Sequence, residues 1–235
     1  MLRPLDREAP PIPRPFSLYR QLEDGDLEFL IKVMGPGTRA LAETRPGERV
    51  QTVGPLGNGW PVVDPGPDPW LLVAGGIGVA PFLMGIEQAV AGTWGPALAP
   101  EQITLIYGAQ TAALLYDLEA YEALGVRVLP ATDDGSAGFS GNVVQALESE
   151  QAAGRLPAQL RILTCGPDPM MAAVARAAAA TGSRCWVSLE TMMGCGVGIC
   201  NGCAVATRPE SEIGDWPFAK CCVDGPVFAA DSIEL

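Results

Sequence analysis

The stretch WLLVAGGIGVAP at residues 70–81 predicts the central fold of this chain. An apolar run ends in glycines, and PFLMGIEQAVAG at 81–92 follows with the apolar spacing of a helix. A continuously apolar run of this length is typical of a strand buried on both faces, as in parallel sheets. The stretch therefore indicates a strand, a glycine loop and a helix that packs back on the sheet.

The same alternation continues downstream. We expect further buried strands at 102–110, 126–135 and 161–166, and helices at 113–124, 142–154 and 170–182. Alternating strands and helices predict a doubly wound parallel sheet, which we assign to a domain at residues 69–187. The fold class is thus multi-domain, with an α/β unit between two smaller regions.

The flanking regions differ from this pattern. In residues 1–68, short strands at 27–33 and 49–54 predict a small antiparallel β unit, and the Gly- and Pro-rich stretch at 54–70 is typical of a linker. Residues 188–235 are short, turn-rich and rich in cysteine. A region of that size buries little core by itself, so a metal that cross-links it is physically reasonable.

Composition excludes several classes of function. The chain has 235 residues, no histidine and a net charge of −12. The missing histidine rules out Ser-His-Asp and Cys-His catalysis and His-ligated zinc, haem or Rieske centres. The negative charge argues against nucleic acid and anionic membrane surfaces as partners. With no apolar run long enough to span a membrane and no signal-peptide pattern, we expect a cytoplasmic protein.

A cysteine motif provides the strongest chemical signal. The segment CGVGICNGC at 195–203 spaces Cys195, Cys200 and Cys203 as C-x4-C-x2-C, and a further pair, Cys221 and Cys222, follows. This spacing with a distant fourth cysteine is that of plant-type [2Fe–2S] sites. Zinc held by four cysteines, or inert core cysteines, are the alternatives. The single short C-x2-C pair and the many glycines favour the iron–sulfur cluster, with either member of the pair as fourth ligand.

Two glycine loops follow predicted buried strands. Gly75, Gly76 and Gly78 lie in the first loop, and Cys165 and Gly166 begin the second. Loops of this kind at the carboxyl ends of parallel strands bind the pyrophosphate of dinucleotides at a helix N-terminus. The segment at 132–136 follows a third strand, and it either contacts ribose hydroxyls or caps a helix.

Two further motifs are compatible with a flavin. Arg14, Pro15, Phe16 and Ser17 form RPFS, in which the arginine suits a phosphate and the serine a flavin ring edge. GPGT at 35–38 offers flexible amides and a hydroxyl for a pyrophosphate. Each motif alone is typical of an ordinary turn, so the case depends on their combination.

The motifs occur in a specific order: RPFS, GPGT, GPLGNGW, GGIGVAP, CGPDPMM, CGVGICNGC and CVDGPVF. From about residue 12 to the C-terminus, this series resembles the electron-transfer subunit of class B dihydroorotate dehydrogenase, within the ferredoxin–NADP reductase superfamily. The resemblance implies an FAD-binding β-barrel at 1–68, a pyridine-nucleotide domain at 69–187 and a [2Fe–2S] domain at 188–235. Family members carry a leading strand or two before RPFS, so we expect a barrel without its opening strands.

The resemblance also implies roles for single residues. It places the Cys165 loop near the nicotinamide, and it selects Cys222 as the fourth ligand because the last ligand of the family precedes x-D-G-P-V-F. The residues implied in FAD binding are Arg14, Pro15, Phe16, Ser17, Leu30, Ile31, Lys32, Gly37 and Thr38.

The implied function is electron transfer in pyrimidine biosynthesis. A catalytic subunit with its own FMN would oxidise dihydroorotate, and electrons would run through the cluster and FAD of this chain to NAD⁺, in a heterotetramer. Flavin converts between hydride and one-electron chemistry. No basic cluster marks a pocket for a 2′-phosphate, which favours NAD. The alternatives are a reductase subunit for a hydrogenase, sulfite reductase or oxygenase, and a non-enzymatic iron–sulfur carrier or sensor.

Overall fold

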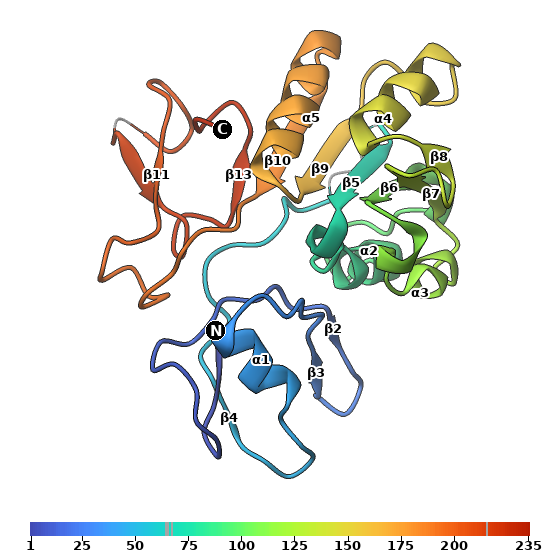
Figure 1. Ribbon diagram of the computed structural model, residues 1–235. Coiled ribbons are helices and arrows are strands. Elements are labelled where there is room, and N and C mark those ends of the chain that lie inside the picture. The colour runs from blue at the N-terminus through green and yellow to red at the C-terminus, as the bar shows by residue number, and fades with distance from the viewer. Residues whose placement is uncertain (64–65, 67, 215) are drawn as a thin grey trace.

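A seven-stranded sheet forms the centre of the molecule (Figure 1). The computed structural model describes residues 1–63, 66, 68–214 and 216–235. The strands lie in the order β13-β10-β9-β5-β6-β7-β8. Their bounds are β5 Trp70–Gly75, β6 Ile103–Ala109, β7 Arg127–Thr132, β8 Phe139–Ser140, β9 Arg161–Cys165, β10 Arg184–Ser188 and β13 Val227–Ala229.

Helices cover both faces of this sheet. Its connections include α2 Phe82–Ala91, α3 Leu118–Glu122, α4 Val143–Ala152, α5 Asp168–Thr181 and the 3-10 turns η1 Gly76–Val79, η2 Pro100–Gln102 and η3 Ala112–Leu114. Leu72 and Leu105 pack in one apolar cluster with α2 and α3, whereas Leu71 and Ile106 pack in another with α4 and α5. The two buried faces explain the continuous apolar strands and confirm the doubly wound prediction.

One detail of the predicted pattern is wrong, and the sheet gains a strand from outside the predicted domain. The helix expected at 113–124 is interrupted, because Asp117 has a left-handed backbone (φ 57°) and α3 begins only after it. The sheet is also mixed at one edge. The strand β10 continues the parallel part, but β13 pairs with it antiparallel.

The N-terminal region consists of two separate antiparallel pairs within residues 1–63. The pairs are β1 (Leu2–Pro4) with β4 (Val50–Thr52) and β2 (Arg20–Gln21) with β3 (Leu27–Glu28), and α1 spans Pro36–Ala42. The strand expected at 27–33 is thus confined to its first residues. Residues 64, 65 and 67 of the predicted linker lie outside the described residues.

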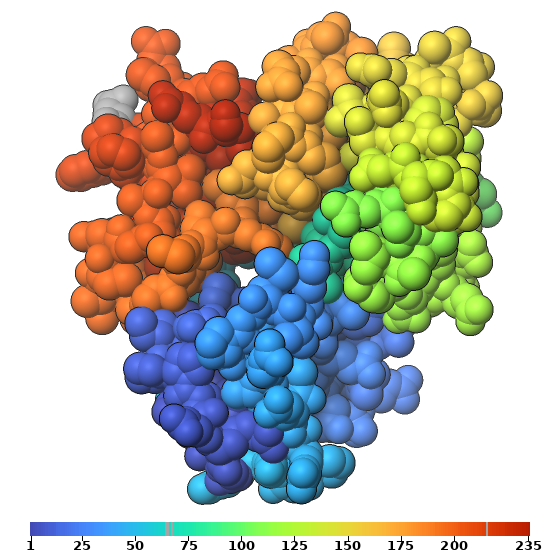
Figure 2. Space-filling model, viewed as in Figure 1, coloured from blue at the N-terminus to red at the C-terminus, as the bar shows by residue number. Residues whose placement is uncertain are grey.

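Specific bonds attach this region to the central sheet unit. The Met84 amide of α2 donates to the Tyr19 carbonyl at 3.1 Å, and the Arg20 guanidinium pairs with Glu87 at 2.8 Å. The Tyr19 hydroxyl donates to Asp117, just before α3. Figure 2 shows the N-terminal region below the other two parts of the chain, with a hollow where the three meet.

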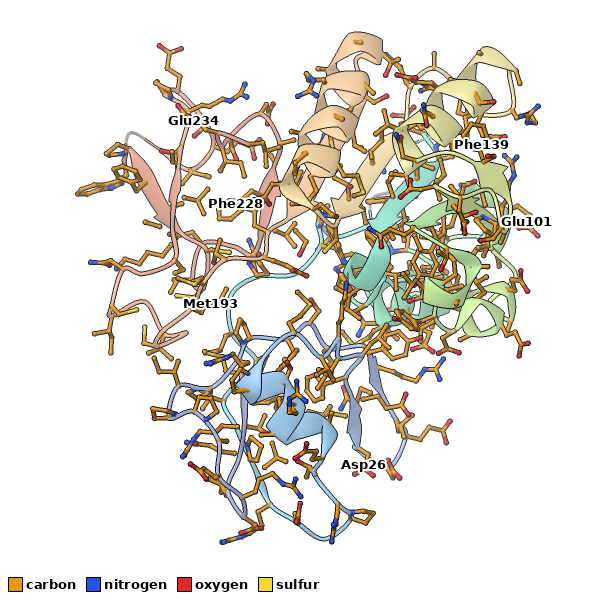
Figure 3. The ribbon with its side chains drawn as sticks, viewed as in Figure 1. Asp26, Glu101, Phe139, Met193, Phe228 and Glu234 are labelled. Carbon is orange, nitrogen blue, oxygen red and sulfur yellow. The ribbon has the colours of Figure 1, made fainter. Side chains whose placement is uncertain are left out.

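The C-terminal region has a small core of its own but shares a strand with the central sheet. Its hairpin pairs β11 (Ala204–Ala206) with β12 (Phe218–Lys220). Phe228, inside this region in Figure 3, belongs both to its core and to β13. The strand β13 therefore anchors the region at the edge of the central sheet.

None of the helices in the described part of the chain combines the length and the apolar character that crossing a membrane requires.

We expect Leu71→Ala to lower the free energy of unfolding by about 2–5 kcal/mol, because it leaves a cavity in the centre of the sheet. Leu71 is 0% exposed, whereas Leu27 in the β2–β3 hairpin is 46% exposed. Leu27→Ala is the matched control, with an expected change within about 0.5 kcal/mol. Denaturant unfolding measures both, and equal effects would contradict the assignment of the core.

Candidate functional site

The predicted cysteine motif lies on a loop that follows β10. Gly196 and Gly198 adopt φ of 73° and 81°, and Asn201 adopts 56°. These left-handed residues turn the backbone repeatedly within a few residues, which glycine permits at low cost. The Lys220 ammonium fixes the loop to β12 through a bond of 2.8 Å to the Gly198 carbonyl.

Backbone amides of the loop point at the sulfur of Cys195. Its Sγ accepts from the amides of Val197, Ile199 and Cys200 at 3.4, 3.3 and 3.4 Å. These bonds, led by that from Cys200, lower the pKa of Cys195 from 9.0 to about 6. The Gly202 amide donates to the sulfur of Cys200 at 3.5 Å. The loop thus favours thiolate sulfur at Cys195, the form that binds metal.

The two cysteines of the later pair have different neighbours. Burial, followed by the interactions with Cys203 and the charge of Cys195, raises the pKa of Cys222 to about 11, although the Gly198 amide acts in the opposite direction. Cys222 thus adjoins the other cysteines of the motif. Cys221 is fully buried, and its thiol lies 3.9 Å from the Leu189 carbonyl.

The donor set fits an iron–sulfur cluster. Thiols from one glycine-rich loop and one later turn lie in the same part of the structure, and amides already point at two of the sulfurs, as they do around Fe–S clusters. Figure 3 shows sulfur atoms gathered beside the labelled Met193. Among the described residues, no three Cys, Asp or Glu side chains surround a single point as ligands of one metal ion would.

The two predicted nucleotide loops pack directly against each other, since β5 and β9 are parallel neighbours. A Cβ on Gly78 would lie 2.3 Å from the Cys165 carbonyl oxygen, and one on Gly75 would lie 2.6 Å from the Met170 sulfur. Gly76 and Gly166 have φ of 55° and 155°. The glycines are therefore required by the contact between the loops and by the backbone.

The thiol of Cys165 is enclosed at the base of these loops. Burial, with a smaller contribution from the charge of Glu190, raises its pKa to about 12. No sequence pattern marks Glu190, because a single carboxylate after a strand is common. In the segment at 132–136, Asp134 accepts from the amide and hydroxyl of Ser136, while Asn142 caps α4. The segment therefore does not cap α4, but the Ser136 hydroxyl accepts from the Ala112 amide, the first of η3, at 2.7 Å.

Two of the predicted flavin motifs meet in space. A Cβ on Gly37 would lie 3.0 Å from Nε of Arg14, so the arginine lies over the GPGT turn. Thr38 Oγ1 accepts from the amides of Met34 and Gly35 at 2.8 and 3.1 Å, which fixes the turn. The first amides of a helix have no intrahelical acceptor, so the turn and Arg14 together fit an anionic pyrophosphate.

The other residues predicted for FAD binding differ in how deeply they are buried. Leu30 is half-buried and packs against the core of the central unit. The remaining five vary in exposure: Pro15, Phe16 and Ile31 are half-buried, and Ser17 and Lys32 are exposed.

Two family models match the chain. The iron–sulfur cluster binding domain of dihydroorotate dehydrogenase B matches residues 190–234. The oxidoreductase NAD-binding domain matches residues 72–176. The two matches cover the cysteine motif and both nucleotide loops.

Curated relatives align over nearly the whole chain. The dihydroorotate dehydrogenase B (NAD(+)) electron transfer subunits of Geobacillus kaustophilus and Bacillus caldolyticus are each 35% identical over 229 residues, 96% of this chain and 81% of the relative. That of Desulforamulus reducens is 34% identical over 220 residues, 93% of this chain and 79% of the relative.

Solved structures agree in fold. That of an NADH-dependent reduced ferredoxin-NADP oxidoreductase has a TM-score of 0.72 at 26% identity, over 97% of this chain and 80% of that one. The ferredoxin reductase in carbazole 1,9a-dioxygenase has a TM-score of 0.58 at 25% identity, over 77% of this chain and 54% of that one.

The lowered pKa predicts the reactivity of the metal-free protein. In reduced protein stripped of metal, Cys195 should be alkylated with a midpoint near pH 6, because its thiolate persists down to that pH. Cys222 should react only above neutral pH, with a midpoint near 11. Mass spectrometry of iodoacetamide-treated protein across pH measures both. A shared midpoint for the two thiols would contradict the role of the loop amides.

Proposed function

Because this chain belongs to the family of dihydroorotate dehydrogenase B electron transfer subunits, we propose that it carries electrons from a dihydroorotate-oxidising, FMN-containing subunit to NAD⁺ through a [2Fe–2S] cluster and FAD. The observation that carries this function is the amide-lined loop of Cys195, joined by β13 to a sheet with nucleotide loops. The chain is thus one component of an oxidoreductase in pyrimidine biosynthesis. A cytoplasmic location and a heterotetramer are part of the proposal.

The proposed division of labour follows three units, at 1–68, 69–187 and 188–235. When bound, FAD exchanges a hydride with NAD(H) and the cluster exchanges single electrons. The protein must hold the two groups and exclude water. The shared strand β13 supports this proposal, because it fixes the third unit against the second.

In the first unit we propose that Arg14 and the turn with Gly37 and Thr38 hold the pyrophosphate of FAD. Their contact supports this role, since a guanidinium and helix N-terminal amides both favour a phosphate. The proposed contacts to the rest of FAD come from Pro15, Phe16, Ser17, Leu30, Ile31 and Lys32.

In the second unit we propose that NAD binds over the paired glycine loops, at Gly75, Gly76, Gly78, Cys165 and Gly166. Gly75, Gly76 and Gly166 are partly exposed, which lets a pyrophosphate approach the backbone of the loops. The raised pKa keeps the buried Cys165 a neutral thiol at physiological pH, so the base of the nucleotide site carries no charged nucleophile.

In the third unit the proposed ligands are Cys195, Cys200, Cys203 and Cys222. The electrostatic influence of both Cys203 and Cys195 on the pKa of Cys222 supports the choice of Cys222, whereas of these two only Cys203 influences the pKa of Cys221, whose thiol lies 3.9 Å from the Leu189 carbonyl.

An exposed apolar surface around the cluster loop is the proposed docking site of the catalytic subunit. Met192 and Ile199 are 89% and 79% exposed, and Val197 and Val223 are also exposed. Apolar side chains grouped at this exposure are typical of an interface, and electron transfer requires that the cluster approach its donor.

One test concerns the proposed ligands of the cluster. Cys222→Ser should remove most of the iron and acid-labile sulfide, while Cys221→Ser, the matched control, keeps both. FAD, released by denaturation and measured separately, should stay in both variants because its proposed site lies in the first unit. Loss of the cluster from Cys221→Ser alone would contradict the assignment of Cys222 as the fourth ligand. Zinc in place of iron and sulfide would contradict the proposed function.

Another test concerns the proposed docking of the catalytic subunit. Ile199→Glu should weaken association with the catalytic subunit by about 2 kcal/mol or more, because it buries a charge in an apolar contact. Leu27→Glu, on the β2–β3 hairpin, is the control and should bind normally. Titration calorimetry with the catalytic subunit measures both, and equal affinities would place the interface elsewhere.

A further inference from the structure

Asn58, in the stretch at 54–70 that the sequence marks as a linker, bonds directly to the segment after the proposed last cluster ligand. Its side-chain Nδ2 donates to the carbonyls of Asp224 and Val227, both at 2.9 Å. Its Oδ1 accepts from the Val227 amide at 2.9 Å, and its own amide donates to the Gly225 carbonyl at 2.6 Å. Four bonds thus join positions 166 to 169 residues apart.

The segment at 224–227, which belongs to the third unit, is also bonded to the end of β10 in the central sheet. The Leu189 amide, at the end of β10, donates to the Pro226 carbonyl at 2.9 Å, and β13 begins at Val227. Cys222 lies two residues before Asp224 in the chain. The segment is therefore the point where the linker, the central sheet and the cysteine region meet.

Backbone contact at this junction is close. Gly57 has φ 70°, and a Cβ there would lie 2.2 Å from the Gly225 carbonyl oxygen. On the other side of the linker, a Cβ on Gly196 would lie 3.1 Å from Cδ1 of Leu56. The linker thus touches both the cluster loop and the turn that follows Cys222.

Apolar packing does not fill the junction. A cleft of about 310 Å³ lies beside it, lined by Asn58, Trp186, Asp224 and Phe228 among others. Asn58 is itself exposed. Hydrogen bonds therefore help to fix the segment against the linker here, and a carboxamide supplies both the donors and the acceptor that they need.

We propose that Asn58 is a positioning residue for electron transfer, which holds the segment of Cys222 in fixed relation to the flavin-binding unit. This inference rests on the proposed function, since it assumes that FAD and the cluster exchange electrons within the chain. The Asn58 side chain touches neither group in its proposed role. It acts through the backbone of residues 224–227, and so through the placement of Cys222.

The test uses the chain loaded with FAD and cluster, mixed anaerobically with NADH. Asn58→Ala should leave reduction of FAD by NADH unchanged and slow the subsequent reduction of the cluster about tenfold, the order of effect seen when supporting shells around metal ligands are lost. Freeze-quenched EPR follows the cluster, and visible absorbance follows the flavin. Asn58→Asp, which keeps the size and the acceptor but loses both donors, should also slow the transfer.

Two further readouts separate positioning from a general loss of stability. Amide hydrogen exchange at 224–228 should rise in Asn58→Ala. The control is Asn142→Ala, another exposed asparagine whose side chain bonds backbone amides, at the start of α4. It should leave transfer and the EPR line shape unchanged.

Slower transfer, or loss of cluster with FAD retained, in the Asn58 variants alone would support the inference. Unchanged transfer and line shape in both Asn58 variants would overturn it, as would an equal effect of Asn142→Ala. A wild-type chain that binds FAD and cluster but passes no electrons between them would overturn the proposed function instead.

Discussion

The antiparallel pairing of β13 with β10 is the contact on which the arrangement of the molecule depends. Ser188 lies opposite Val227 on one side and beside Cys165 in the parallel register on the other. One residue of β10 thus relates the second nucleotide loop to the segment after Cys222. Without that ladder, a region of this size would lose its strand pairing with the central sheet. Backbone hydrogen bonds thus fix the register between the two sites, and the Asn58 side chain adds bonds from the first unit to the same segment.

Local electrostatics then distinguish cysteines of the same chain. Three amides lower the pKa of Cys195, whereas burial raises that of Cys165 and Cys185 to about 12. The first is suited to a metal, and the other two remain neutral thiols within the fold. Cys221 and Cys222 are adjacent in sequence, but the residues around their two thiols differ. The same residue type therefore serves as proposed ligand or as core according to the backbone around it.

Much of this could be predicted from periodicity and spacing, because those signals are local. The apolar runs at 70–76, 102–110 and 161–166 all become strands of the central sheet, and the glycines of both nucleotide loops stand where close contact demands them. What the sequence could not show depends on distant partners. The strand β13 is only three residues long, and Asn58 gains its role from residues more than 160 positions away. The break at Asp117 was missed because the apolar spacing continues through it.

The central claim is that this chain connects dihydroorotate oxidation to NAD⁺. The most direct test adds dihydroorotate and NAD⁺ to the anaerobic complex of this chain with its catalytic subunit, and follows NADH formation together with FAD, iron and sulfide content. The account predicts that NADH forms only when both subunits are present and that the chain carries FAD with equal amounts of iron and acid-labile sulfide. A complex that contains these groups but forms no NADH from dihydroorotate would contradict it.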